Sequence, residues 1–178
     1  MTTKLNFSRC LNITLAHEGG WSDRITDPGG ATMKGVTLRT YSDYLKRAAT
    51  KQELMNISED EIKDIYYNGY WMPVGGNVLS PGLDLVMFDF AVHSGPGRAI
   101  SHLQSIAGTR MDGKMGPITL AGVGAFESKW GTKELIIRLM ASRSKFLRGT
   151  NLWKEYGRGF AKRLYSVEQE ALKLEAEG

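Results

Sequence analysis

Two acidic residues, Glu18 and Asp27, lie within ten positions of one another near the amino terminus. Glu18 ends a series of mostly apolar residues at helical spacing, whereas Asp27 opens the turn-forming sequence Asp27-Pro28-Gly29-Gly30. Partial burial favours the protonated form of a carboxyl group, and a solvated turn favours the ionised form. Glycoside hydrolysis needs one carboxyl group of each kind, the first to protonate the leaving oxygen and the second to orient water or stabilise positive charge on the sugar. Both residues are therefore candidate catalytic groups, with an arginine partner for Glu18 and a turn-capping role for Asp27 as open alternatives.

The segment that leads to Glu18 is expected to be a helix. One narrow arc at 3.6 residues per turn contains Phe7, Leu11, Thr14 and Glu18, and Cys10 and Leu15 flank it. Gly19-Gly20 follows at once and supplies the left-handed backbone that commonly ends a helix. Glu18 is thus predicted to lie in the final helical turn, facing the core or a cleft beside it. The β-branched pairs Ile25-Thr26 and Val36-Thr37 then predict a small hairpin or an irregular loop around the Asp27 turn.

The rest of the chain predicts a series of helices and a mainly α fold. A capping box at Ser58 and Glu61, the pair Ser80-Pro81, and Pro117 each mark a helix start. The run 85–92 is apolar on nearly every side and predicts a central helix that breaks at Ser94-Gly95-Pro96-Gly97. A last helix is expected from about Gly157, with a charged tail, residues 168–178, that frays. Helical spacing also marks residues 38–48, 62–69, 100–106 and 135–146.

Composition places the chain among compact globular proteins. Its 178 residues fit one body, and 42% hydrophobic with 24% charged residues excludes disordered and fibrous classes. The single cysteine excludes an internal disulfide. A net charge of +4 gives mild attraction to polyanions without selecting nucleic acid, lipid or a cell-wall polymer. Since no apolar run suits a secretory signal or a membrane span, we expect a protein made in the cytoplasm without a signal peptide.

Other catalytic chemistries have little support in the sequence. The chain has three histidines and lacks HExxH and CxxC motifs, so we predict no metal site and no cofactor. Ser94 beside His93 lacks the G-x-S-x-G context of a serine nucleophile. Gly122-Val123-Gly124 lacks the third glycine of a dinucleotide-binding loop.

Aromatic residues close to the two carboxylates in sequence are candidates for stacking against sugar rings. Trp21, Tyr67 and Trp71 are predicted to line the cleft, whereas Tyr66, at helical spacing with Ile62, is predicted to pack in the core. Basic residues of the carboxyl-terminal third are predicted to lie mostly on a solvated helix face. They are Arg143, Lys145, Arg148, Lys154, Arg158, Lys162 and Arg163.

Four motifs together carry a resemblance to a known family. The first is His17-Glu18-Gly19-Gly20-Trp21 followed by the stretch from Asp27 to Thr37, and the second runs from Phe88 to Ala99. The stretch from Asp112 to Leu120 is similar to a companion peptidoglycan-binding segment, and Gly157-Arg158-Gly159-Phe160 with Arg163 is similar to a closing signature. The motifs cover nearly the whole chain and resemble glycoside hydrolase family 108, lysozyme-like N-acetylmuramidases found largely as bacteriophage endolysins.

This resemblance implies a two-lobed, lysozyme-like helical fold with a small β-hairpin after the first helix. It implies a catalytic domain over residues 1–95 and a helical, peptidoglycan-binding-like segment over residues 96–178 packed on the same body. Glu18 matches the catalytic glutamate, the general acid, and Asp27 and Thr32 match the aspartate and threonine that hold the attacking water. His93 stands where the family pattern has asparagine and is expected to hydrogen-bond substrate.

The resemblance further implies a monomeric muramidase that cleaves the β-1,4 bond between N-acetylmuramic acid and N-acetylglucosamine in peptidoglycan. Its expected partners are glycan strands and a phage holin that releases it to the cell wall, with no nucleic acid and no stable membrane insertion. Two alternatives stay open. A lytic transglycosylase would act on the same bond with one glutamate and leave an anhydro sugar. A non-catalytic wall-binding module would use the stretch from Asp112 to Leu120.

Overall fold

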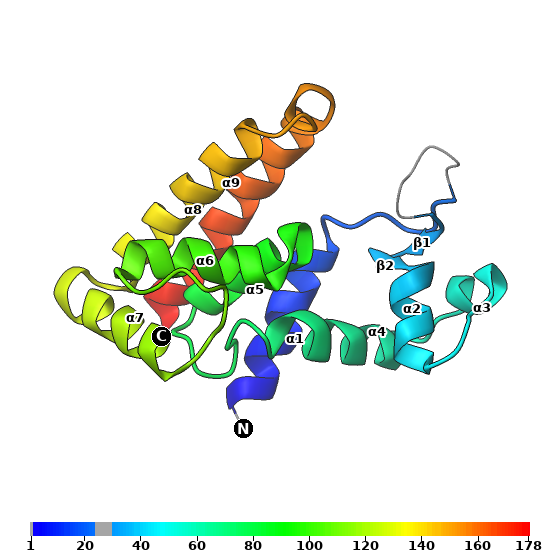
Figure 1. Cartoon of the computed structure of the whole chain (residues 1–178), viewed down its shortest axis with the longest axis horizontal. Helices are drawn as coiled ribbons and strands as arrows, with labels where there is room; N and C mark the ends of the chain where they lie inside the picture. The colour runs from blue at the N-terminus through cyan, green and yellow to red at the C-terminus, as the bar shows by residue number, and fades with distance from the viewer. Residues whose placement is uncertain (1, 24–29) are drawn as a thin grey trace.

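The computed structural model of the chain describes residues 2–23 and 30–178. Over these residues the chain is mainly helical, with one antiparallel hairpin after the first helix, as the sequence predicted (Figure 1). The elements are α1 (Thr2–Leu15), β1 (Thr32–Met33), β2 (Val36–Thr37), α2 (Leu38–Leu45), α3 (Lys51–Met55), α4 (Glu59–Tyr66), the π-helical turn η1 (Tyr67–Trp71), α5 (Leu83–Ser94), α6 (Pro96–Ala107), α7 (Pro117–Trp130), α8 (Thr132–Arg148) and α9 (Trp153–Glu177).

The larger of two lobes is built around α5. Its residues 83–91 are all buried, and α6, α8 and α9 pack against it (Figure 1). A helix surrounded by other helices buries every face, which explains why this run is apolar on all sides. Asp84 and Asp89 are the two charged exceptions, and both are buried. Each of these carboxylates must therefore be held by partners within the protein.

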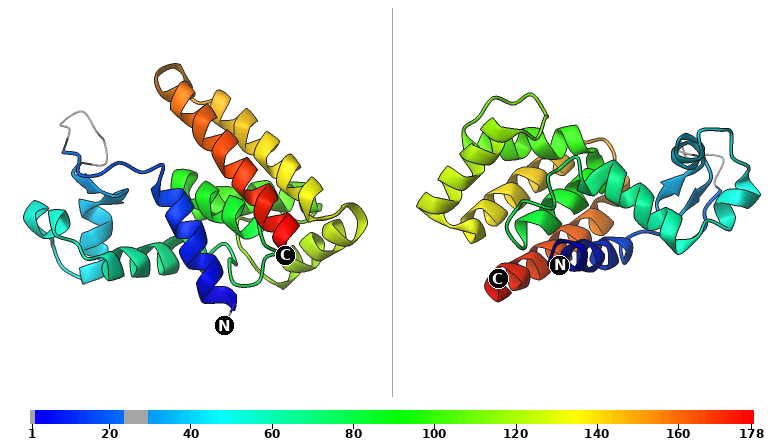
Figure 2. Two further views of the ribbon diagram at one scale, coloured as in Figure 1. Left: turned by 180° about the vertical axis from the view of Figure 1, so that it is seen from behind. Right: turned by 90° about the horizontal axis from the view of Figure 1, so that it is seen from below.

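The smaller lobe contains the hairpin with α2, α3 and α4 (Figure 2). In the hairpin, Thr32 lies opposite Thr37 and Met33 opposite Val36, and an isolated bridge joins Ser22 to Thr32. The chain enters this lobe from α1 and leaves it through α4 and η1, which packs on α5 (Figure 1). Glu18, between α1 and the hairpin, therefore lies in the connection between the lobes.

Local signals correctly predicted several helix starts. The Ser58–Glu61 capping box opens α4, and Pro117 is the first residue of α7. The predicted break falls between the end of α5 at Ser94 and the start of α6 at Pro96. A second capping box, Thr50 with Glu53, opens the short α3, which the periodicity did not predict.

Four boundaries differ from the prediction. Helix α1 ends at Leu15, so Glu18 lies beyond it, and the first hairpin strand is Thr32–Met33 instead of Ile25-Thr26, which lies outside the described residues. The central helix begins at Leu83, after a turn that contains Ser80-Pro81. Helix α9 extends from Trp153 to Glu177, so the tail is helical and does not fray. Its apolar residues Val167, Ala171 and Leu174 are buried, and this packing holds the last turns in place.

Asp84 gives the fold a specific pH dependence. Its Oδ1 accepts hydrogen bonds from the backbone N–H groups of Gly82 (2.9 Å) and Leu85 (2.7 Å), yet burial raises the pKa of Asp84 from 3.8 to about 6. The folded protein then holds a proton that the unfolded chain releases, so this residue's contribution to the free energy of unfolding should fall as pH rises from about 4 to about 6. In urea titrations, Asp84→Asn should lose this part of the pH dependence, and exposed Asp60→Asn should keep it. An unchanged pH profile in Asp84→Asn would contradict the assignment.

No helix among the described residues has both the length and the apolar character required to cross a lipid bilayer.

Candidate active site

Glu18 lies in a turn just after α1. Its backbone N–H donates to the carbonyl oxygen of Leu15 (3.0 Å), and its side chain keeps 19% of its surface exposed. The turn carries the residue off the helix and toward the hairpin. The carboxyl group is therefore largely enclosed by protein but still open to solvent on one side.

Arg163 of α9 binds this carboxyl group. Its Nη1 donates to Glu18 Oε1 at 2.7 Å, so the alternative in which Glu18 pairs with an arginine is confirmed. The same guanidinium donates through Nε and Nη2 to the carboxylate of Asp89, at 3.1 and 2.8 Å. Because Asp89 fixes two of its nitrogen atoms, Arg163 presents Nη1 to Glu18 in one direction.

Asp89 is shared between two arginines. Its Oδ2 lies 2.7 Å from Nη2 of Arg143, and both side chains are 0% exposed. Burial alone raises the pKa of Asp89, but the two guanidinium groups outweigh that effect and hold it at about 2. Asp89 is therefore ionised at neutral pH. The acid network, which we define as Glu18, Arg163, Asp89 and Arg143, has no net charge when both acids are ionised.

The hairpin turn closes on the other side of Glu18. Gly35 has a φ of +78°, and a Cβ there would overlap the Tyr66 hydroxyl and lie 3.0 Å from Glu18 Oε2. The Tyr66 hydroxyl donates to the carbonyl oxygen of Lys34 (2.8 Å) and anchors the turn to α4. Burial raises the pKa of Tyr66, so it remains a donor. Oε1 of Glu18 therefore accepts a hydrogen bond from Arg163, and Oε2 lies beside Gly35, which has no side chain.

Gly35→Ala should lower activity more than the matched variant Gly30→Ala. Both glycines have a positive φ, so both variants carry similar backbone strain of about 1–2 kcal/mol. A Cβ at position 35 would overlap the Tyr66 hydroxyl and lie close to Glu18. A Cβ at position 30 would have no described residue within 4 Å. Rates of peptidoglycan solubilisation, compared with midpoints of thermal unfolding, will separate the two effects. Equal activity losses in the two variants would show that contact with Glu18 does not matter.

Thr32, the third predicted catalytic residue, lies on the hairpin side of the site. Thr32 lies in β1, on the hairpin whose turn contacts Glu18. Asp27 lies outside the described residues, so its catalytic role stays a prediction. Trp21 is partly buried and packs against the core. In the chain it lies between Glu18 and Ser22, which forms the isolated bridge to Thr32.

The aromatic residues of η1 lie mostly in the core. Trp71 is 0% exposed and donates from its indole nitrogen to Asn77 Oδ1 (2.7 Å). This burial leaves no face of the indole open to a sugar, so the prediction that Trp71 binds substrate is wrong. Tyr67 is half-buried, with its hydroxyl accepting from Asn77 Nδ2 (3.0 Å). Tyr66 is buried, as predicted.

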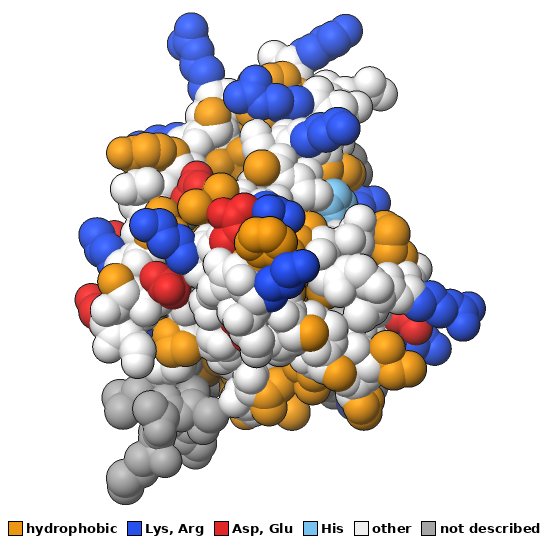
Figure 3. Space-filling model, turned by 90° about the vertical axis from the view of Figure 1, so that its left-hand side faces the viewer, with side chains coloured by type: hydrophobic (Ala, Val, Ile, Leu, Met, Phe, Trp, Pro, Cys, Tyr) orange, Lys and Arg blue, Asp and Glu red, His pale blue; other side chains and the backbone are white. Residues whose placement is uncertain are grey.

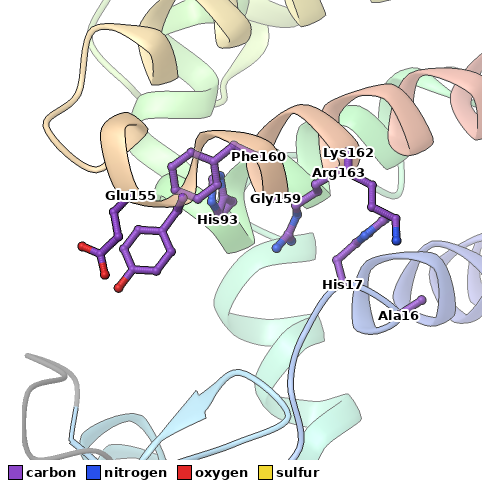
Figure 4. Close-up of a pocket in the computed structure, with 9 residues that line it drawn as sticks. Ala16, His17, His93, Glu155, Gly159, Phe160, Lys162 and Arg163 are labelled. Carbon is purple, nitrogen blue, oxygen red and sulfur yellow. The ribbon is translucent and has the colours of Figure 1, made fainter.

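A pocket of about 500 Å³ adjoins the acid network (Figure 4). His93, at the end of α5, lines it, and its ring meets the Phe160 ring edge-on, with centroids 4.8 Å apart. Burial and the two nearby arginines lower the pKa of His93 to about 4, so the imidazole is neutral at pH 7. We call this space the α9 pocket, and its lining residues are Ala16, His17, His93, Glu155, Tyr156, Gly159, Phe160, Lys162 and Arg163.

The sequence analysis assigned no role in the site to Asp89, Arg143 or Arg163. Both arginines were counted with a solvated helix face, but Arg143 is fully buried and Arg163 nearly so. The other five basic residues, Lys145, Arg148, Lys154, Arg158 and Lys162, are exposed, as predicted. Figure 3 shows one face of the molecule, on which Lys and Arg side chains project singly. A signal was present for Asp89, because a carboxylate inside an all-apolar helix needs a buried cationic partner. Nothing in the sequence identified which arginines supply it.

The described residues contain no group of three or more His, Cys, Asp or Glu side chains arranged to hold a metal ion. Acid–base chemistry by carboxyl groups, as at Glu18, is the chemistry that these side chains support.

Comparison with known proteins assigns the family. The sequence model described as "Glycosyl hydrolase 108" matches residues 11–95. A search of curated proteins gave no match. Among solved structures, one described as "Structure of Brucella abortus SagA" is 35% identical to this chain, with 97% of each chain covered and a TM-score of 0.87. This chain therefore belongs to the glycosyl hydrolase 108 family and is a glycoside hydrolase.

Proposed function

We propose that this protein is an endolysin-type N-acetylmuramidase that hydrolyses the β-1,4 bond between N-acetylmuramic acid and N-acetylglucosamine. Membership of the family indicates a glycosidase that hydrolyses peptidoglycan. The observation that carries the finer proposal is the placement of Glu18. This carboxyl group is held between Arg163 and the hairpin turn, at the connection of the two lobes and beside a pocket.

Each oxygen of Glu18 has a separate task in this mechanism. Oε1 accepts the hydrogen bond from Arg163, which leaves Oε2 to carry the proton. That proton passes to the glycosidic oxygen as the C1–O bond breaks, and C1 becomes electron-deficient. Water then adds to C1, and its proton passes either to Asp27 or back to the now ionised Glu18. Asp27 stabilises the positive charge or orients this water, and Thr32, on the hairpin that contacts Glu18, helps to position it.

Residues 96–178 are proposed to assist binding to the wall. The stretch from Asp112 to Leu120 uses its polar side chains internally. Asp112 Oδ1 accepts from Gln104 Nε2 (2.8 Å) and from the Lys114 N–H (3.0 Å), and Thr119 Oγ1 accepts from Gln104 Nε2 (2.9 Å). These bonds fix the loop to α6, so direct contact with the wall is expected to come from other side chains.

In the same proposal the protein acts as a monomer on the cell wall. It reaches the wall from the cytoplasm of the producing cell through a membrane-permeabilising partner such as a phage holin. Co-expression in bacteria with and without a holin tests this route, with lysis expected only when both proteins are present.

Digestion of purified sacculi, followed by mass spectrometry of the released muropeptides, tests the reaction. A hydrolase yields reducing muramic acid ends, which carry the mass of one added water. Anhydro-muramic ends would instead identify a lytic transglycosylase. Binding to sacculi without released muropeptides would identify a non-catalytic module.

A further inference from the structure

We propose that the α9 pocket binds the peptide that peptidoglycan carries on its muramic acid, and not a further sugar. This inference rests on the proposed function and specifies the substrate that the site accepts. The pocket lies between the end of α1, the end of α5 and the first half of α9 (Figure 4). Its volume of about 500 Å³ is large enough for several amino acid residues.

The position of the pocket places it next to the reacting bond. Arg163 lines the pocket and also donates to Glu18, and His17 of the lining directly precedes Glu18 in the chain. The hairpin turn lies beside the other oxygen of Glu18, Oε2. A muramic acid held at Glu18 therefore has the hairpin on one side and the α9 pocket on the other, within reach of a substituent on the sugar.

The charges of the lining fit a peptide. Glu155, Gly159 and Lys162 follow one another at helical spacing on the same face of α9, and Figure 4 shows the two charged side chains at opposite ends of the pocket. Seven residues of helix separate these ends by roughly 10 Å. An extended peptide of three residues spans a similar length, about 10 Å. A stem peptide carries both carboxylate and amino groups, whereas N-acetylglucosamine is neutral.

Two aromatic rings, Tyr156 and Phe160, line the pocket. Tyr156 is 48% exposed, and Phe160 packs against Trp153 and Tyr156, with ring centroids 6.2 Å apart in each case, and against the edge of His93. Such apolar surfaces pack against alkyl side chains as well as against a sugar ring. The two opposite charges at the ends of the pocket are therefore the feature that favours a peptide over a neutral pyranose ring.

Gly159 offers a way to fill the pocket without altering the network. It is exposed, and a side chain added there meets nothing within 4 Å. Gly124 of α7 is a matched control, because it is also an exposed helical glycine with nothing within 4 Å and does not line the pocket. Phenylalanine favours the helix over glycine, so Gly159→Phe and Gly124→Phe should both fold.

The experiment compares two substrates for wild type and both variants. One substrate is intact peptidoglycan, and the other is the same glycan after an amidase has removed its peptides. With intact peptidoglycan, Gly159→Phe should lower kcat/KM by about ten- to hundredfold, mainly through KM, the size expected for loss of one charge-assisted hydrogen bond. With the stripped glycan it should match wild type, and Gly124→Phe should match wild type on both.

Lys162→Ala provides a second variant that depends less on steric effects. The Lys162 side chain is exposed, so its removal should not affect folding. We expect the same decrease in kcat/KM on intact peptidoglycan and no decrease on the stripped glycan. Equal losses on both substrates would make the pocket a sugar subsite and overturn the proposal. No loss on either substrate in both variants would also overturn it. A wild type that cleaves neither substrate would instead refute the proposed function.

Discussion

Glu18→Gln is expected to slow peptidoglycan hydrolysis by about 10²–10⁴-fold, the typical contribution of a general acid. The amide keeps an oxygen that can accept from Arg163 Nη1, so the side chain can stay in place while it loses the ability to release a proton. Binding of the variant to sacculi should therefore resemble that of wild type. Release of reducing ends from sacculi measures the rate, and co-sedimentation measures binding.

Glu134→Gln is the matched control for this experiment. Glu134 is partly exposed on α8 and pairs with Arg138 one helical turn away, so its side chain is not part of the acid network. Its replacement should leave the rate unchanged. Hydrolysis by Glu18→Gln at the wild-type rate would remove Glu18 from the mechanism.

Asp89→Asn should cause the largest loss of stability. The variant leaves two guanidinium groups, Arg143 and Arg163, in the interior without their shared counter-charge. Breaking a buried ion pair from one side costs about 3–5 kcal/mol. For a chain of this length, that corresponds to a decrease in Tm of roughly 6–20 °C. Differential scanning calorimetry or circular dichroism at pH 7 measures it.

The pH dependence of this variant gives an independent check. Because the pKa of Asp89 lies at about 2 in the folded protein, below its ordinary value of 3.8, the stabilisation is present above about pH 4 and is lost as pH falls toward 2. The difference in Tm between wild type and Asp89→Asn should therefore shrink on acidification. A difference that stays constant down to pH 2 would argue against an ionised Asp89.

Two further variants define the origin of the loss. Asp89→Asn combined with Arg143→Met removes the buried charge of Arg143, while Arg163 still pairs with Glu18, and should recover part of the stability. Asp60→Asn, which removes a carboxylate at the exposed start of α4, should change stability by less than about 0.5 kcal/mol. If Asp89→Asn and Asp60→Asn unfold at the same temperature, the buried pairs do not stabilise the fold.

The helices could be predicted where the deciding signal is local. Ser58 and Glu61 satisfy each other's backbone donors within a few residues, and Pro117 needs no distant partner to begin a helix. The end of α9 could not be predicted in the same way. Its charged sequence suggests fraying, and only the burial of Val167, Ala171 and Leu174 against the rest of the protein overrides it.

The first strand of the hairpin was predicted at the wrong residues for a different reason. The strands of the hairpin have two residues each, and its turn places Lys34 as well as Gly35 at positive φ. Lysine rarely adopts that conformation, so the sequence gives a weak turn signal at this point. The Tyr66 hydroxyl, bonded to the carbonyl oxygen of Lys34, helps to hold the turn, and that contact spans 32 residues of sequence.

For the candidate site, the sequence pointed to Glu18 as a candidate acid but not to the residues that surround it. Glu18 was recognisable from its place after an apolar arc and from its motif. Its partner Arg163 lies 145 residues away, and local periodicity carries no information about such a pairing. Trp71 was misassigned because its position beside a turn suggested exposure, whereas the π-helical turn directs it into the core.

The pairing of Glu18 with Arg163 also governs when the protein can become active. During synthesis, Glu18 leaves the ribosome long before α9. Its carboxyl group therefore lacks the hydrogen bond from Arg163 until α9 has been made. A fragment cut to residues 11–95 would contain Glu18 and Asp89 and lack both arginines. On the proposed mechanism, the shortest active fragment therefore extends through α9, and truncations from the carboxyl terminus should abolish catalysis before they reach residues 11–95.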